Sequence, residues 1–252
     1  MGVKVEIPTG SPFTIQNIPF RIISTKDNPT PHCATAIGSY ENDPLIYSQD
    51  VHLNKLSLQT SFENLLNQPV LNTFAALPHD LRKNVRDTII QDINNARVEE
   101  QCLIPLSQIT VHLPMHMSGY SDFHCSLEHC QSCSPMAAGA VIPKYSFYAP
   151  SVYNSRVSSV IPSAQPVRRP RGMFLKDGDT PTCGPSQELD YDLEIGCFVS
   201  KLVPFSFELN IAEADEPIFE FVLLNDWSAR DLQMFKMKPL GPFHAKDESS
   251  II

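Results

Sequence analysis

The stretch Phe219-Glu-Phe-Val-Leu-Leu-Asn-Asp-Trp-Ser-Ala-Arg-Asp-Leu-Gln233 decides the fold prediction. It begins as an apolar run typical of a strand, and after an Asn-Asp pair its spacing becomes typical of a helix. In that helix Asp226, Arg230 and Gln233 share one face, because they lie at i, i+4 and i+7. Trp227, the only Trp of the chain, is expected in the turn. A carboxylate, a guanidinium and an amide on one face of a strand-to-helix junction indicate a functional site.

Length and composition predict a folded protein of one or two domains. The 252 residues can bury a sizeable core, and 42% hydrophobic against 19% charged residues is typical of globular chains. The net charge of −9 argues against nucleic acid as a main partner. No apolar run reaches the ~18 residues of a membrane span, and the N-terminus lacks the apolar stretch of a signal peptide. Seven cysteines without a secretory signal indicate reduced thiols and a cytoplasmic location.

Hydrophobic periodicity predicts short strands, then helices, in the first third of the chain. The expected strands are Phe20–Thr25, His32–Tyr40 and Leu45–Gln49, and the expected helices are Ser61–Asn67, Leu71–Leu77 and Pro78–Ile93. Leu103–Pro114 has Pro near both ends and is expected to be an extended linker, so we place a domain boundary there, between residues 1–114 and 115–252. Glu188–Val199 alternates and predicts a further strand.

Several acidic residues are candidates for a cation site. Asp192 and Glu194 lie at i and i+2, which is one face of a strand. Such a pair is costly unless a cation or solvent compensates it, and an ordinary solvent-facing strand is the simpler alternative. With Asp122 and Asp226 the set has the oxygen ligands that suit Ca²⁺ or Mg²⁺. His129, two helical turns from Asp122 if that segment is helical, would serve as a general base toward a metal-bound water, or is simply a surface His.

A second cluster of side chains raises the question of zinc. Its members are His124, Cys125, His129, Cys130 and Cys133. Cys130-Gln-Ser-Cys133 has the spacing of zinc ligands, but no second well-spaced pair follows. We therefore favour unbound small side chains over a zinc-binding structural module.

Taken together, the sequence resembles the fumarylacetoacetase family, with features of its fungal members. The motifs that carry the resemblance occur in the family's order over nearly the whole chain. They are Ser11-Pro-Phe, Gly119-Tyr-Ser-Asp-Phe123, Tyr153-Asn-Ser-Arg-Val-Ser-Ser159, Pro166-Val-Arg-Arg-Pro170, Leu189-Asp-Tyr-Asp-Leu-Glu194, Asn225-Asp-Trp-Ser-Ala-Arg-Asp231 and Pro239-Leu-Gly-Pro-Phe243.

The resemblance implies a mainly β fold with some α. It implies a small N-terminal SH3-like β-barrel domain and a mixed β-roll catalytic domain, in a homodimer. It also implies hydrolysis of the C–C bond of 4-fumarylacetoacetate to fumarate and acetoacetate, the last step of tyrosine and phenylalanine catabolism.

The resemblance also assigns roles to individual residues. The implied ligands of Ca²⁺ or Mg²⁺ are Asp122, Asp192, Glu194 and Asp226. The implied catalytic residues are His129 as general base, with Arg230, Gln233 and Lys246 polarising the substrate and stabilising the leaving carbanion. The implied substrate-binding positions are His124, Tyr153, Gln233 and Met237.

The chain departs from the family pattern at several of these positions. His124 and Met237 stand where the family commonly has Tyr, and Asp192 replaces a Glu that is one methylene longer. The family continues past Lys246, so we expect a C-terminally truncated form with an incomplete catalytic domain, in which the strand Phe219–Leu224 lacks sheet partners. The alternatives are a non-catalytic truncated product and a sibling hydrolase for another acylpyruvate-like diketo acid.

Overall fold

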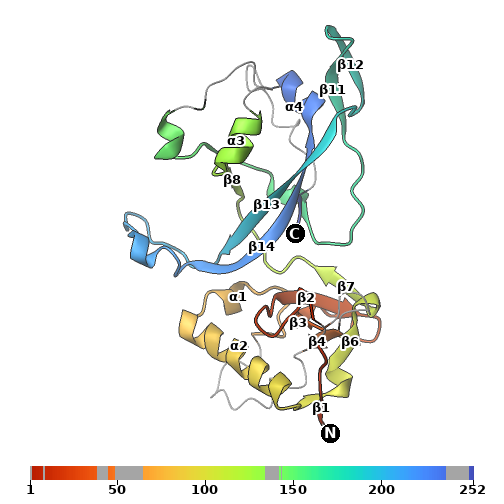
Figure 1. The fold of residues 1–252 in the computed structure, drawn as a ribbon, viewed down its shortest axis with the longest axis vertical. Coiled ribbons are helices and arrows are strands. Elements are labelled where there is room, and N and C mark those ends of the chain that lie inside the picture. The colour runs from red at the N-terminus through yellow and green to blue at the C-terminus, as the bar shows by residue number, and fades with distance from the viewer. Residues whose placement is uncertain are drawn as a thin grey trace.

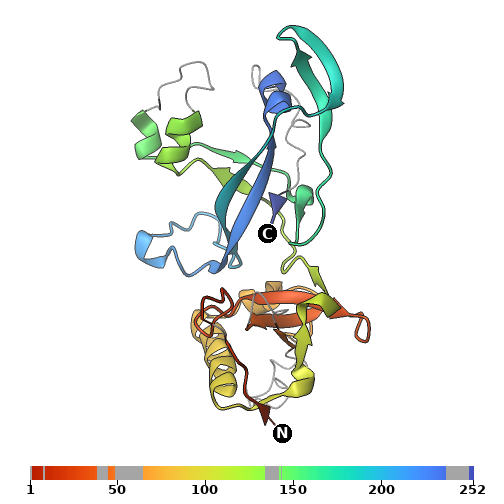
Figure 2. The same cartoon turned by 45° about the vertical axis from the view of Figure 1, so that its right-hand side comes forward.

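The computed structural model describes residues 2–7, 9–38, 45–48, 65–133, 142, 144–236 and 250–252. The strands are β1 (Gly2–Val3), β2 (Phe20–Thr25), β3 (His32–Ile37), β4 (Leu45–Ser48), β5 (Val98–Glu99), β6 (Leu103–Pro105), β7 (Ile109–His112), β8 (Ser121–Phe123), β9 (Val152–Asn154), β10 (Val160–Ile161), β11 (Arg171–Lys176), β12 (Thr180–Pro185), β13 (Leu189–Val199), β14 (Ile218–Ala229) and β15 (Ser250–Ile251). The α-helices are α1 (Asn72–Ala75), α2 (His79–Asn94), α3 (Leu127–Cys133) and α4 (Arg230–Lys236). This content confirms a mainly β protein with some α, and Figures 1 and 2 show its elements in two lobes.

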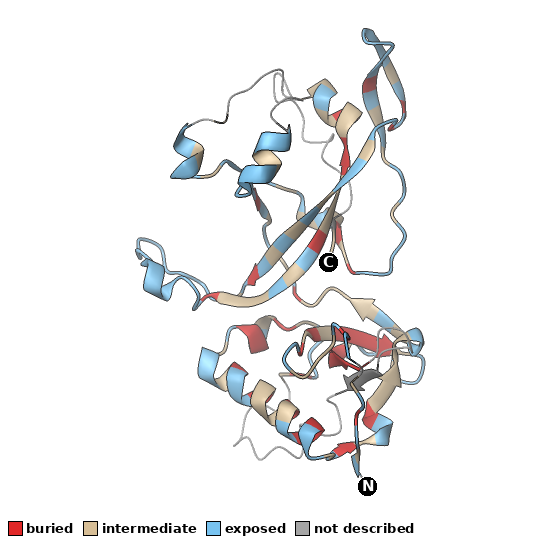
Figure 3. Ribbon diagram, viewed as in Figure 1, coloured by how far each residue is buried: buried red, intermediate tan, exposed pale blue. Residues whose placement is uncertain are grey.

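The first lobe is an antiparallel sheet packed against α2. Its strand order is β6-β4-β3-β2-β7. The sheet buries Ile22 fully, and α2 contributes Val85, Ile89 and Ile93 at helical spacing to the same core. Figure 3 shows most of the buried residues gathered here. The described strands form an open sheet with β6 and β7 at its edges, so the SH3-like barrel is not confirmed.

Several element predictions for this lobe are confirmed, and one is wrong. The strands β2, β3 and β4 and the helices α1 and α2 lie where periodicity places them. Leu103–Pro114 is not a linker, since β6 and β7 form both edges of the sheet. Pro105 ends β6, and an edge strand tolerates the missing N–H of a Pro. Of the helix expected at Ser61–Asn67, residues 61–64 lie outside the described part, and residues 65–67 form a turn.

The second lobe is built on the long antiparallel hairpin of β13 and β14. Its sheet has the order β10-β15-β14-β13, with β10 and β15 parallel. Along β13 the side chains alternate between one face that is partly buried and one that is exposed. The exposed face carries Leu193, Ile195, Phe221 and Leu223, which the described residues leave uncovered. The finer prediction of a β roll stays a prediction. None of the described helices has the length and apolarity to cross a membrane.

The closed end of the hairpin, where β14 begins, packs on the first lobe. Phe219 of β14 contacts Phe20 and Phe74, with ring centroids 6.2 and 6.0 Å away. Two hydrogen bonds join the same surfaces: Arg82 Nη1 donates to the carbonyl of Ile218 (3.2 Å), and the N–H of Phe20 donates to Glu220 Oε1 (3.2 Å). These contacts fix the start of β14, at the opposite end of the strand from Asp226, so the first lobe supports the strand.

Glu220 at this contact is expected to make stability depend on pH. Burial raises its pKa from 4.5 to about 7, although the N–H of Phe20 and the charges of Arg86 and Arg21 oppose the shift. Because the folded-state pKa is raised, the stabilising effect of the bound proton is complete below pH 4.5 and is lost as the pH rises to about 7. Glu220→Gln keeps an acceptor for Phe20, and should raise the free energy of unfolding on the order of 3 kcal/mol at pH 8.

Urea unfolding of both proteins at about pH 4.5 and about pH 8 checks this expectation. The difference between the variant and the parent should become small at the lower pH, where Glu220 is protonated in the folded state and about half protonated in the unfolded state. An equal difference at both pH values would show that the carboxylate is not titrating across this interval.

Candidate metal centre

Three of the predicted carboxylates converge. Asp122 of β8, Glu194 of β13 and Asp226 of β14 each place one oxygen within 4.8 Å of the others. The β13–β14 register explains two of them: Asp226 lies opposite Asp192, so it shares a face with Glu194 two residues further on. Asp122 is buried and reaches the group from the separate β8–β9 pair. All ligand atoms of the group are carboxylate oxygens, the donors preferred by hard divalent cations.

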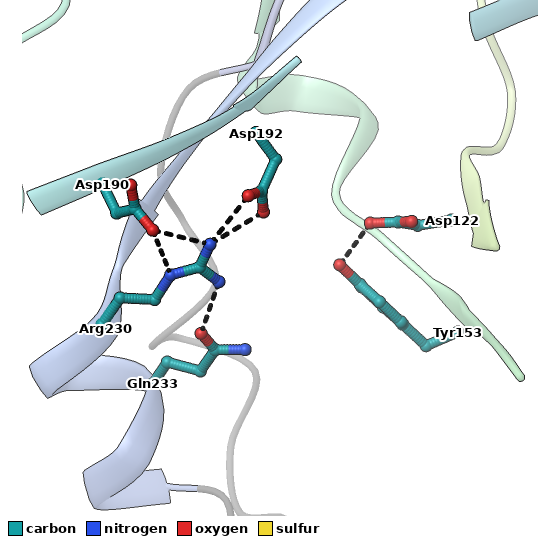
Figure 4. Close-up of polar contacts among 6 residues, drawn as sticks. All are labelled: Asp122, Tyr153, Asp190, Asp192, Arg230 and Gln233. Atoms are coloured by element: carbon teal, nitrogen blue, oxygen red, sulfur yellow. Dashed lines mark hydrogen bonds and ion pairs between the residues drawn. The ribbon is translucent and has the colours of Figure 1, made fainter. Parts of the chain in front are cut away.

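Tyr153 holds Asp122 in place. The two residues lie opposite each other in the β8–β9 ladder, and the Tyr153 hydroxyl donates a hydrogen bond to Asp122 Oδ2 (Figure 4). Burial raises the pKa of Tyr153 above its usual range, and the hydrogen bond to Asp122 and the charges of Asp122 and Asp226 raise it further. The phenol therefore stays protonated and acts as a donor, which leaves the other carboxylate oxygen of Asp122 for a cation.

The fourth predicted ligand, Asp192, is not a member of this group and contacts Arg230 instead. Arg230 Nη2 donates to both oxygens of Asp192, at 2.9 Å each, and its Nε donates to Asp190 Oδ2 at 3.0 Å. Burial alone would lower the pKa of Arg230, but the hydrogen bonds and charges of Asp192 and Asp190 raise it above its ordinary value. Arg230 is thus a fixed cation beside the carboxylate group.

The expected helical face of Asp226, Arg230 and Gln233 is wrong. β14 continues through Trp227 to Ala229, and α4 begins only at Arg230. The ladder continues because the residues after Asp226 still find partners on β13, with Trp227 opposite Tyr191 and their rings 6.1 Å apart. Only Arg230 and Gln233 share the helix, and Arg230 Nη1 donates to Gln233 Oε1 at 3.4 Å.

His124 and His129 lie next to Tyr153, the residue that is hydrogen-bonded to Asp122. His129 belongs to α3, where its N–H donates to Ser126 Oγ (3.1 Å). Asp122 is on the strand β8, so the condition that one helix carries both residues is not met. The His129 ring stacks on His124 with centroids 6.5 Å apart, and the His124 ring lies 5.9 Å from Tyr153. The side chains therefore form a continuous series of contacts from Asp122 through Tyr153 and His124 to His129.

Asp190 of β13 carries its negative charge beside Arg230. The pKa of Asp190 is lowered first by a hydrogen bond from the backbone of Tyr191 and then by Arg230, while burial opposes the shift. A smaller contribution in the same direction comes from His129.

Zinc is not indicated by the geometry. In the described ranges the group suited to a metal contains carboxylates alone, and the described cysteines are free thiols. Cys125 is exposed, and Cys130 Sγ contacts the carbonyl of His124 at 3.9 Å. Two other predicted site residues, Met237 and Lys246, lie outside the described residues.

Two residues of the site were not predicted from the sequence. Asp190 contacts Arg230, and its alternation with Asp192 and Glu194 on one strand face was the available signal. Asp231 accepts hydrogen bonds from Ser186 Oγ at 2.6 Å and from the N–H of Gln187 at 2.7 Å. It ties the start of α4 to the segment before β13, a long-range contact for which the sequence alone gives no signal.

Comparison with known proteins gives family-model matches over most of the chain. Residues 16–114 match the family model described as fumarylacetoacetase N-terminal, and residues 119–251 match fumarylacetoacetate (FAA) hydrolase C-terminal. The chain is 37% identical to the fumarylacetoacetase of Aspergillus fumigatus and 36% identical to that of Emericella nidulans, over all of this chain and 62% of each relative. It is 33% identical to the fumarylacetoacetase of Homo sapiens, over 96% of this chain and 60% of that protein.

The chain therefore spans about three fifths of the length of these relatives, 60–62%. Among solved structures, a 2-hydroxyhepta-2,4-diene-1,7-dioate isomerase from Mycobacterium marinum matches with a TM-score of 0.48 and 12% identity. That match covers 93% of this chain and 64% of the other.

Proposed function

Because this chain belongs to the fumarylacetoacetate hydrolase family, we propose that it serves the metal-dependent hydrolysis of a C–C bond in a 1,3-diketo acid. The proposed substrate is 4-fumarylacetoacetate, and the products are fumarate and acetoacetate, which places the protein at the end of tyrosine and phenylalanine catabolism. The observation that supports this most is the convergence of Asp122, Glu194 and Asp226 beside Arg230.

The three carboxylates fit a divalent cation. Their oxygens are hard ligands, and one oxygen from each residue leaves room for water and substrate oxygens in the coordination shell of Ca²⁺ or Mg²⁺. When bound, such an ion polarises the diketone oxygens and stabilises the enolate that leaves. We propose Asp122, Glu194 and Asp226 as the ligands of this ion.

The other residues supply proton transfer and hydrogen bonding. His129 accepts a proton from the water that attacks the ketone carbon, and the C–C bond then breaks to give a carboxylic acid and an enolate that takes up a proton. Arg230 and Gln233 donate hydrogen bonds to the oxygen on which negative charge develops, and Lys246 is proposed to assist them. We propose that His124, Tyr153 and Met237 lie against the substrate.

The larger context is also a proposal. Residues 1–114 and 115–252 are proposed as two domains, the second with a β-roll fold, in a cytoplasmic homodimer without nucleic-acid or membrane partners. Because the chain spans 62% of its fungal relatives, the activity, substrate and partners of those whole proteins come to this chain only as proposals.

A turnover assay tests the function. The purified chain is incubated with 4-fumarylacetoacetate and Mg²⁺ or Ca²⁺, and the loss of the diketo acid is followed by its ultraviolet absorbance. We expect hydrolysis that stops with EDTA and returns when the cation is added back. Faster hydrolysis of another acylpyruvate would assign a sibling activity. Cation binding without turnover of any diketo acid would contradict enzymatic function for this chain.

A further inference from the structure

We propose that Asp190 and Asp192 form a carboxylate cradle that positions Arg230, and that Asp192 in this chain serves the arginine and not the cation. The inference rests on the proposed function for the purpose of Arg230, but its geometry does not depend on turnover. Figure 4 shows the two side chains on one side of the guanidinium and Gln233 on the other. Each guanidinium nitrogen has a partner: Nε contacts Asp190, Nη2 contacts both Asp residues, and Nη1 contacts Gln233.

The register of the hairpin builds the cradle. Asp190 lies opposite Ser228 and Asp192 lies opposite Asp226, so both carboxylates stand on the face over which the chain turns into α4. The N–H of Arg230 donates to the carbonyl of Glu188 at 2.9 Å, which fixes its backbone directly above this part of β13. From this backbone position the side chain of Arg230 reaches the carboxylates of both Asp190 and Asp192.

The backbone on the other side of Arg230 is fixed as well. Asp231 receives hydrogen bonds from Ser186 Oγ and from the N–H of Gln187, and Ser186 in turn accepts one at its carbonyl from Arg169 Nη1 at 2.8 Å. The start of α4 is thereby held to the segment that leads into β13. A guanidinium held by its own side-chain partners and by its backbone has little rotamer freedom left to lose when it meets a substrate.

The contact with Asp192 is stronger than an ordinary surface ion pair. Arg230 is 14% exposed and Asp192 is 19% exposed, whereas Asp190 is 52% exposed. Charge-assisted hydrogen bonds to both carboxylate oxygens are favourable at such depth, while exposed pairs contribute little. Asp192 is therefore the principal partner, and Asp190 fixes the direction of the guanidinium plane through Nε.

The contact with Arg230 separates Asp192 from the cation group. Asp192 lies directly opposite Asp226 on the ladder, yet it is Glu194, two residues further along β13, that joins Asp226 and Asp122. The carboxylate of Asp192 is turned toward Arg230, which neutralises it. The consequence is a division of the acidic residues into a three-carboxylate group for the cation and a two-carboxylate cradle for the arginine.

The test separates the two roles by Mn²⁺ affinity, measured by electron paramagnetic resonance on the purified chain. Asp192→Asn should weaken Mn²⁺ at most about tenfold, the effect of losing one screened nearby charge. Glu194→Gln should weaken it by more than about 100-fold, as expected for a direct ligand. If Asp192→Asn weakens Mn²⁺ as much as Glu194→Gln, Asp192 is a ligand and the proposal is overturned.

A second measurement reports on Arg230 itself. In ¹⁵N-labelled protein, the Nε–Hε resonance of Arg230, assigned by its loss in Arg230→Lys, should shift or broaden in Asp190→Asn and Asp192→Asn. It should be retained in Glu194→Gln, and Asp190→Glu should restore it in part. An unchanged resonance in Asp190→Asn would refute the cradle. Asp190 is exposed, so this variant is informative even if Asp192→Asn does not fold. Neither readout uses the diketo acid. If the parent protein does not hydrolyse it, the proposed function is contradicted, but the proposal that Asp190 and Asp192 position Arg230 is still tested.

Discussion

Glu194→Gln is expected to weaken Mn²⁺ or Ca²⁺ binding by more than about 100-fold, because even partners that only orient metal ligands cost about 10–100-fold when they are lost. The amide keeps the shape of the side chain but removes one of the three negative oxygens within 4.8 Å of one another. Isothermal titration of parent and variant with each cation gives the two affinities. Hydrolysis of the diketo acid should fall with the occupancy of the site.

The same substitution should not destabilise the metal-free protein. Three carboxylates in contact repel one another without a cation, so removing one charge relieves repulsion. The thermal midpoint of the variant should equal or exceed that of the parent without metal, and the rise that excess cation gives the parent should disappear. Glu188→Gln is the matched control, since Glu188 is exposed and precedes β13. If both variants lose affinity equally, general charge and not ligation explains the effect.

Local patterns in the sequence predicted several of the longer regular elements. Alternation of apolar and polar residues predicted β13, and the spacing of Val85, Ile89 and Ile93 predicted α2. Both patterns are local, because the residues that share one face of a strand or helix recur at a fixed spacing within that element. Two of the predicted carboxylates also followed from local spacing, since Glu194 and its neighbour at i−2 share a strand face. The convergence of Glu194 and Asp226 with Asp122 had to be inferred from family motifs, because β8 is far away in sequence.

The main errors share a physical origin, which is contact between segments that are distant in sequence. The Asn-Asp pair before Trp227 is typical of a turn, but β13 offers partners as far as Leu189 opposite Ala229, so the strand continues. Leu103–Pro114 has the prolines of a linker, but β4 and β2 accept its two halves as edge strands. Asp190 was missed for the same reason, because its partner Arg230 is 40 residues away.

His129→Ala should lower the rate of hydrolysis by about 10²–10⁴-fold, the range that a positioned general base contributes. His129 is outside the three-carboxylate group, so the affinity for Mn²⁺ should stay within about threefold of the parent. Alanine is a good helix former, and Ser126 caps α3 through the backbone N–H of residue 129, so the helix should persist. Steady-state kinetics and Mn²⁺ titration of the same preparation measure both quantities.

The controls for this variant distinguish a lost base from a disturbed fold. His79→Ala removes a different, exposed imidazole on α2 that has no part in the proposed reaction. This variant should leave both the rate and the Mn²⁺ affinity unchanged. Added imidazole should restore part of the rate to His129→Ala, because the cavity left by the ring can admit a free base of the same chemistry. If His129→Ala keeps the parental rate, the water must lose its proton to another group. If it loses Mn²⁺ affinity together with rate, His129 supports the carboxylate group and its assignment as the base fails.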